Sequence, residues 1–161
     1  MSEILGTLFK YLMMLLGVAA VVFILYEVLG SNKTSNAVSQ TTQMVSSIQA
    51  LYAGQNNFSS LNNVISSNPA TVVPSAMLGG GNPITDPWGG AVTVQTDANP
   101  SMFDVILTQV PNKACASLAA SMGSFESLTI NGTSLTPPVD AGAADAACNA
   151  TTNSLTFVYG G

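Results

Sequence analysis

Apolar residues form one long block at the start of the chain. From Ile4 to Tyr26 almost every position is apolar, with Lys10 as the only charge inside the block and Glu3 at its edge. The uncharged run from Tyr11 to Tyr26 would measure about 24 Å as a helix, and counting back to Ile4 makes the block long enough to cross a bilayer. No basic stretch precedes the block and no A-x-A site closes it. We therefore expect a retained helix rather than a cleaved signal peptide.

A one-sided helical pattern follows this block. Apolar or small residues recur at intervals of three and four, while Ser and Gln occupy the other faces. The recurring positions are Ala37/Val38, Thr41, Met44/Val45, Ile48 and Leu51/Tyr52. A candidate break lies at Gly30-Ser31-Asn32, and Gly54 is the expected helix end. The sequence predicts one long helix that is apolar on all sides in its first half and amphipathic in its second.

Strand patterns are confined to the rest of the chain. Alternating, β-branched or apolar runs predict strands at Ala91–Thr96, Met102–Val110, Phe125–Asn131 and Ser154–Tyr159. A short helix is expected between the second and third runs, with Pro111 near its start and Gly123 at its end. Residues 54–90 and 132–153 are rich in Gly, Asn, Ser and Pro or of low complexity, so both are predicted to be loops. The expected fold is α+β: an antiparallel sheet of about four strands packed on the amphipathic half-helix.

The charged residues exclude several function classes. The chain has no Arg and no His, its only bases are Lys10, Lys33 and Lys113, and its formal net charge is −5. So few cations cannot hold nucleic acid electrostatically. Without His or a G-x-S-x-G motif, the serines lack a general base. We therefore expect neither an enzyme nor a bound cofactor.

The two cysteines, Cys115 and Cys148, cannot complete a four-ligand zinc site by themselves. In an extracytoplasmic chain, two cysteines favour one disulfide. Such a bond would tie the loop at 132–153 to the short helix that carries Cys115. Two unpaired buried thiols are the alternative.

The order of these features resembles a type IV pilin, and more specifically a type IVb major pilin. The most specific pieces are "TSNAVSQTTQMVSSIQALYAGQNNF" (Thr34–Phe58), "NPITDPWGG" (Asn82–Gly90) and the pair Cys115/Cys148. In layout the resemblance covers the whole chain. It implies a subunit whose apolar half-helices pack together as a filament core, with the globular parts as the outer wall and the cysteine-bounded region exposed.

The resemblance also implies an organisation and a set of partners. Residues 1–30 would be membrane anchor and filament core, and residues 31–161 the globular domain. This domain would comprise an amphipathic half-helix (34–53), a loop region (54–90) and a sheet with the disulfide-bounded region (91–161). The expected partners are identical subunits, the inner membrane before assembly, the prepilin peptidase and the pilus assembly machinery. The expected final location is an extracellular pilus that serves adhesion, aggregation or conjugative contact.

Three residues are the candidate assembly site. In the family, a glutamate at the fifth mature position neutralises a neighbour's N-terminal amine, but here that position is Leu5 and the nearest acid is Glu3. With a leader already removed, Met1 would be the mature, methylated N-terminus and its amine would share Glu3. Glu3 and Lys10 are seven residues apart on one helix face, so we expect them to pair between neighbouring copies. The alternative is that Lys10 snorkels to a headgroup or to the filament lumen.

Two other functions fit parts of the sequence. Type II secretion pseudopilins carry a stretch similar to "DPWGG" near a calcium-binding loop, and Asp86 with Asp97, or Asp140 with Asp145, could supply oxygen ligands. The interpretation we favour is a turn shaped by Asp86-Pro87, with Trp88 packed on the sheet. A single-pass anchor carrying an extracytoplasmic binding domain is the other alternative. A lone anchor in lipid has no use for Lys10, whereas a bundled core can pair it.

Overall fold

The computed structural model describes the backbone of residues 2–161 and the side chains of residues 2–21 and 32–161. Met1, one of the candidate assembly residues, lies outside the described residues. The chain divides into two compact units, Met1–Asn32 and Lys33–Gly161. Helix α1 (Ser2–Leu51) contributes to both units.

The first unit is a helix whose described side chains are all exposed. The candidate break at Gly30-Ser31-Asn32 is wrong, because α1 continues through these residues. A helix interior tolerates a single glycine at a cost of only about 1 kcal/mol, and no proline is present here to remove a backbone donor. Helix α1 ends at Leu51, close to the expected end at Gly54, which lies in the turn that follows.

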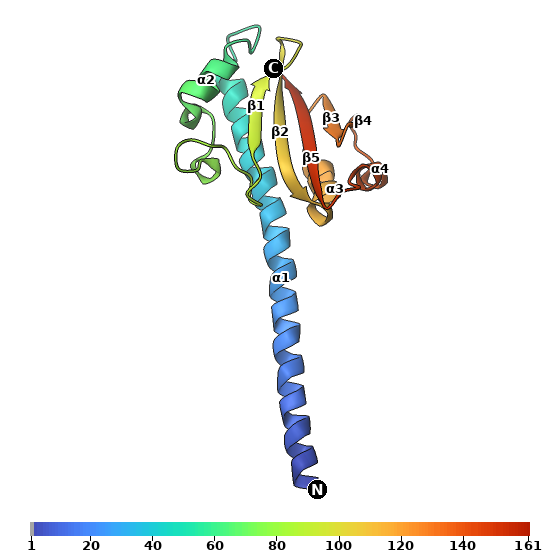
Figure 1. Ribbon diagram of the computed structural model, residues 1–161. Helices are drawn as coiled ribbons and strands as arrows, with labels where there is room; N and C mark the ends of the chain where they lie inside the picture. Colours follow the sequence, from blue (N-terminus) through green and yellow to red (C-terminus); the bar gives the residue numbers. More distant parts are fainter. Residues whose placement is uncertain (1) are drawn as a thin grey trace. The chain divides into compact units, whose positions relative to one another are not determined.

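The second unit contains one antiparallel sheet of five strands in the order β1-β2-β5-β3-β4. The strands are β1 (Val92–Thr96), β2 (Met102–Pro111), β3 (Ser127–Ile130), β4 (Thr133–Leu135) and β5 (Thr152–Gly160). The two longest strands, β2 and β5, pair at the centre of the sheet (Figure 1). The four predicted strands are therefore all present, and the sheet has one more strand, β4, within the region predicted to be a loop.

Helix α2 (Leu61–Ser67) lies beside one edge of this sheet and α4 (Ala141–Ala147) beside the other, while α3 (Asn112–Ser121) lies near the end of β2 and the start of β5 (Figure 1). Helix α2 contacts β1, while α3 contacts β2 and β5. Helix α4 packs against α3 and contacts β4. Two 3₁₀ turns, η1 (Pro69–Thr71) and η2 (Ser75–Met77), follow α2. The prediction of α3 is confirmed, whereas the loop predictions for 54–90 and 132–153 missed α2 and α4.

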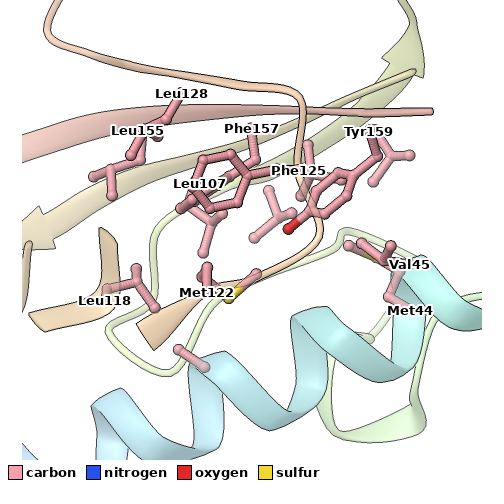
Figure 2. Packing of buried hydrophobic residues seen from close by; sticks show 14 of the residues in the cluster. Met44, Val45, Leu107, Leu118, Met122, Phe125, Leu128, Leu155, Phe157 and Tyr159 are labelled. Atoms are coloured by element: carbon pink, nitrogen blue, oxygen red, sulfur yellow. The ribbon is translucent and has the colours of Figure 1, made fainter. Parts of the chain in front are cut away.

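The core of the second unit lies between α1 and the sheet. Ala37, Thr41, Met44, Val45, Ile48 and Tyr52 are buried, as the predicted stripe requires, whereas Leu51 is 42% exposed. Figure 2 shows Met44 and Val45 of α1 on one side of the core, with Phe157 and Tyr159 of β5 on the other. The side-chain amide of Gln49 also donates to the Gly160 carbonyl at 2.7 Å. This part of α1 is thus held by apolar burial and by one bond to the last strand.

Candidate assembly segment and disulfide-bounded region

The candidate assembly segment is the part of α1 that precedes the sheet-packed half. Ser2–Val21 is the one helical segment among the described residues that is long and apolar enough to cross a membrane. All of its large hydrophobic side chains are more than half exposed, and Leu12, at 54%, is the least exposed of them. A contiguous apolar surface of this kind marks a membrane or protein contact. The segment therefore needs lipid or another polypeptide around it.

The charges of this segment lie on its surface. Glu3 and Lys10 are both exposed, and the backbone carbonyl of Glu3 accepts a hydrogen bond from the Thr7 hydroxyl at 2.9 Å. At 1.5 Å per residue, the separation of seven positions from Glu3 to Lys10 corresponds to about 10 Å along the helix axis. The pairing of these two residues between copies stays a prediction.

The disulfide-bounded region is fixed at both of its ends. Cys115 in α3 and Cys148 at the end of α4 form a disulfide, as the sequence predicts, and both cysteines are buried. The Asn112 side-chain amide donates to the carbonyls of Cys148 and Ala150. The disulfide and these bonds hold the end of α4 against the beginning of α3.

A second set of amide bonds connects this region to the sheet. Asn131 donates to the Ala147 carbonyl at 3.1 Å and to the Asn153 side chain at 2.7 Å. Asn153, which is 2% exposed, donates in turn to the Val110 carbonyl at 3.3 Å. Buried amides bonded in this way define one arrangement of the chain. The sequence did not predict this network, because its asparagines come together only through the fold.

Strand β4 and helix α4 also carry recognisable local signals. Asn131-Gly132 is the two-residue turn between β3 and β4, with positive φ at both residues (49° and 88°). An Asn-Gly pair of this kind is the strongest short signal for a hairpin. Asp140 caps α4, since its carboxylate accepts from the Ala143 N–H at 2.9 Å. The cap lies in the region predicted to be a loop, and the turn lies where that region meets the predicted strand Phe125–Asn131.

The "DPWGG" stretch forms a tight turn, which confirms the favoured interpretation. One carboxylate oxygen of Asp86 accepts from the N–H groups of Trp88 (3.0 Å) and Gly90 (2.8 Å). Trp88 packs against the core, and a Cβ on Gly90 would lie 2.0 Å from the Thr108 carbonyl oxygen. The turn therefore lies directly against β2. Within the described part of the chain, no three His, Cys, Asp or Glu residues gather as a metal site.

Two buried carboxyl groups in the second unit have raised pKa values. Burial raises the pKa of Asp86, and the hydrogen bonds from Gly90 and Trp88 partly oppose this rise. Burial also raises the pKa of Asp104. A hydrogen bond from Gln95 at 3.3 Å partly opposes this rise in the pKa, and the negative charge of Asp97 adds to it. Each carboxylate keeps one buried oxygen without a hydrogen-bond partner. Both groups therefore cost stability when they are ionised.

The chain matches a known protein family over most of its length. The family model described as "PilS N terminal" matches residues 31–160. The chain belongs to this family. It is also 33% identical over 103 residues to proteins named "Major structural subunit of bundle-forming pilus" from Escherichia coli O127:H6 (strain E2348/69 / EPEC) and Escherichia coli O111:H-. That alignment covers 63% of this chain and 53% of each relative, so the chain spans about half the length of the curated relatives it matches.

Solved structures agree with the family at the level of the fold. A type IV b pilin from Salmonella typhi has a TM-score of 0.53 at 22% identity, with 81% of this chain and 99% of that chain covered. TcpA, a type IV pilin from the Vibrio cholerae El Tor biotype, has a TM-score of 0.55 at 11% identity, with coverages of 79% and 98%. Together with the family match, these similarities confirm the resemblance to type IVb pilins.

Proposed function

We propose that this PilS N-terminal family member is a structural subunit of an extracellular type IVb pilus. The observation that carries the proposal is the difference between the two units: the second has its own buried core, while the first exposes an apolar helix on all sides. Relatives named as the major structural subunit of a bundle-forming pilus support it. In this function the first unit is the membrane anchor before assembly and the filament core afterwards.

The finer parts of the proposal concern the assembly residues and the partners. Met1, Glu3 and Lys10 are the proposed assembly residues, with the Met1 amine sharing the Glu3 carboxylate. The subunit would wait in the inner membrane, be processed by a prepilin peptidase and be added to a helical filament by the pilus assembly machinery. The polar, uncharged loops within Thr133–Asn153 and Asn56–Ser67 would face outward and serve adhesion, aggregation or conjugative contact. Their composition suits contact without long-range charge steering.

Mechanical shearing of cells that produce the full chain tests this function. A pilus subunit is released into the supernatant as thin filaments that electron microscopy detects and that antibodies to residues 31–161 decorate. Cells lacking the chain are the control. If the chain instead stays in the membrane fraction as single molecules, the single-pass binding protein is the better interpretation. Protease access on intact filaments then checks whether the loops before and around Cys148 face outward.

A further inference from the structure

Asn131 is the only asparagine of the chain that is followed by glycine. An asparagine loses its side-chain amide when the backbone nitrogen of the next residue attacks the side-chain carbonyl carbon. Glycine favours this attack, because it has no Cβ to obstruct it and its backbone turns freely. Asn131-Gly132 forms the exposed turn between β3 and β4, so water reaches it. The turn therefore combines the two groups and the solvent that deamidation requires.

Hydrogen bonds hold both ends of the Asn131 side-chain amide. Its Oδ1 accepts from the Ser154 N–H at 3.0 Å. Its Nδ2 donates to the Ala147 carbonyl at 3.1 Å and to Asn153 Oδ1 at 2.7 Å, and Asn149 Oδ1 lies 3.5 Å from the same nitrogen. Attack on Cγ makes this carbon tetrahedral and ends in the loss of Nδ2, so it must break the bonds of the planar amide. Deamidation is therefore slow while these bonds are present.

The acceptors of the Asn131 amide nitrogen all lie within residues 147–153, the segment that contains Cys148. This segment is held to α3 from its other side by the disulfide. The Asn112 side-chain amide of α3 also donates to the Cys148 and Ala150 carbonyls. Release of the segment from α3 therefore removes support from the groups that hold the Asn131 amide.

We propose that Asn131 is a deamidation site that the intact fold keeps closed and that reduction of the Cys115–Cys148 disulfide opens. A dithiol in the surroundings supplies the two electrons and two protons of this reduction and becomes a disulfide itself. The Gly132 nitrogen then attacks Cγ of Asn131 and forms a new C–N bond. The Cγ–Nδ2 bond breaks, and Nδ2 leaves as ammonia with the proton of the Gly132 N–H. Water opens the resulting five-membered imide at either carbonyl and leaves aspartate or isoaspartate.

The product carboxylate does not fit the network that held the amide. An ionised carboxylate only accepts hydrogen bonds, whereas the Ala147 carbonyl and Asn153 Oδ1 both take a donor from Asn131. Asn153 cannot turn its own nitrogen toward the carboxylate without losing its bonds to the Val110 and Ala150 carbonyls. Reoxidation of the cysteines therefore does not restore the contact. Deamidation permanently marks a chain whose disulfide has once been opened.

Peptide mass spectrometry of the full chain in detergent, incubated at mildly alkaline pH in water labelled with heavy oxygen, tests the proposal. Heavy oxygen incorporated at residue 131 reports deamidation during the incubation. We expect at least tenfold faster deamidation with a dithiol reductant than without it. Cys115→Ser combined with Cys148→Ser should show the fast rate without reductant, which separates loss of the disulfide from direct action of the reductant. Equal rates with and without reductant, or no deamidation under either condition, would overturn the proposal.

Asn112→Ala tests the same segment while the disulfide stays intact. Because Asn112 is exposed, its loss loosens residues 147–153 without opening the core. Deamidation of Asn131 should rise at least twofold, with an unchanged circular dichroism spectrum as the check on the fold. Lys113→Ala, at the neighbouring exposed position of α3, is the matched control and should leave the rate unchanged. A rate unaffected by Asn112→Ala would show that the segment does not control the site.

Gly132→Ala tests whether the backbone nitrogen is the nucleophile. In the reduced chain the added Cβ should slow deamidation at least tenfold, although alanine at a φ of 88° strains the turn. That strain by itself would open the site and raise the rate, so a fall identifies the blocked attack. An unchanged rate would indicate direct hydrolysis of the side-chain amide and overturn the proposed step.

Asn131→Asp reproduces one of the two products in a chain with an intact disulfide. Limited proteolysis within residues 147–153 should be at least threefold faster in this variant than in the parent. Asn149→Asp is the matched control, because it adds the same charge at an exposed position and still offers an acceptor to Asn131. Equal protease resistance of the two variants would show that the carboxylate is accommodated, and the permanent mark would then be wrong.

Discussion

The two halves of α1 show that one helix can depend on two different sources of burial. In the second half, the stripe from Ala37 to Tyr52 is covered by the chain's own sheet, and the remaining faces are polar. In the first half, residues 2–21 are exposed on every side although they are far more apolar. Helix propensity alone gives little stability in water, where packing of an apolar face provides most of it. The second half is therefore stabilised within the chain, while the first half needs lipid or another polypeptide around it.

Removing the first half of α1 should have the largest effect on the protein. A chain lacking residues 1–30 keeps the described core of the second unit, the sheet and the disulfide. We expect a soluble, folded monomer that forms no filaments, measured by light scattering, circular dichroism and electron microscopy. The full chain in detergent is the control for the fold. Filaments from the truncated chain would show that assembly does not depend on the first unit.

Loss of the disulfide should have the next largest effect, and this effect concerns the stability of the second unit alone. Its cysteines are 33 residues apart, and closing a loop of this size stabilises a fold by roughly 3–4 kcal/mol on the chain-entropy model. Replacing both Cys115 and Cys148 with Ser should lower the free energy of unfolding of the truncated domain by about this amount. Denaturant melts measure the change. Reductant should destabilise the parent domain and leave the double variant unaffected, and a reductant-sensitive double variant would contradict the assignment.

A smaller effect is expected where the "DPWGG" turn meets β2. Because an added Cβ at Gly90 would overlap the Thr108 carbonyl, Gly90→Ala should cost about 1–3 kcal/mol through displacement of the turn. Gly80→Ala is the matched control, since a Cβ there meets nothing within 4 Å and the residue has no positive φ. Thermal melts of both variants compare the two sites. Equal stability would show that the turn can move away from the strand without loss.

The features that could be predicted from the sequence are those with a strong repeating pattern. The stripe on α1 recurs five times over about four turns of helix, and the runs in β1, β2, β3 and β5 are long enough for alternation or apolar content to identify them. Strand β4 has only three residues, and α4 is a seven-residue segment of Ala, Gly and Asp. Periodicity cannot identify elements this short. The local signals for them, the Asn131-Gly132 turn and the Asp140 cap, do not depend on periodicity and were not used in the prediction.

The features of the candidate site also differ in whether the sequence could predict them. The cysteine pair could be predicted because two cysteines leave a single pairing. The asparagine network could not, because Asn131 and Asn153 come together only through the pairing of β3 with β5. The proposed role of Glu3 and Lys10 would be a property of several copies, so the structure of one chain does not test it. Asp104 was also missed, since a single acid within an apolar strand has no local pattern.

Asp104 gives the smallest and most specific test of whether the second unit satisfies its own polar groups. Burial raises the pKa of this carboxyl above its ordinary value, and one of its oxygens has no hydrogen-bond partner. Below the pKa of the unfolded chain the group is protonated in both states and has no effect on the pH dependence. As the pH rises through the unfolded and then the folded pKa, the folded state is increasingly penalised for holding the charge. Ionised Asp104 therefore lowers stability at neutral pH relative to acidic pH.

Replacing Asp104 with Asn keeps the shape of the side chain and removes this penalty. We expect Asp104→Asn to raise the melting temperature of the truncated domain at pH 7 and to leave it nearly unchanged at a pH below the ordinary range of aspartate. Gln95 can still bond the new amide, because its own amide can turn to offer either its oxygen or its nitrogen. Asp145→Asn is the control for net charge, since Asp145 is exposed on α4. A stabilisation by Asp104→Asn that is equal at both pH values would indicate better packing rather than a relieved charge. No stabilisation at pH 7 would mean that solvent or a neighbouring donor already compensates the carboxylate.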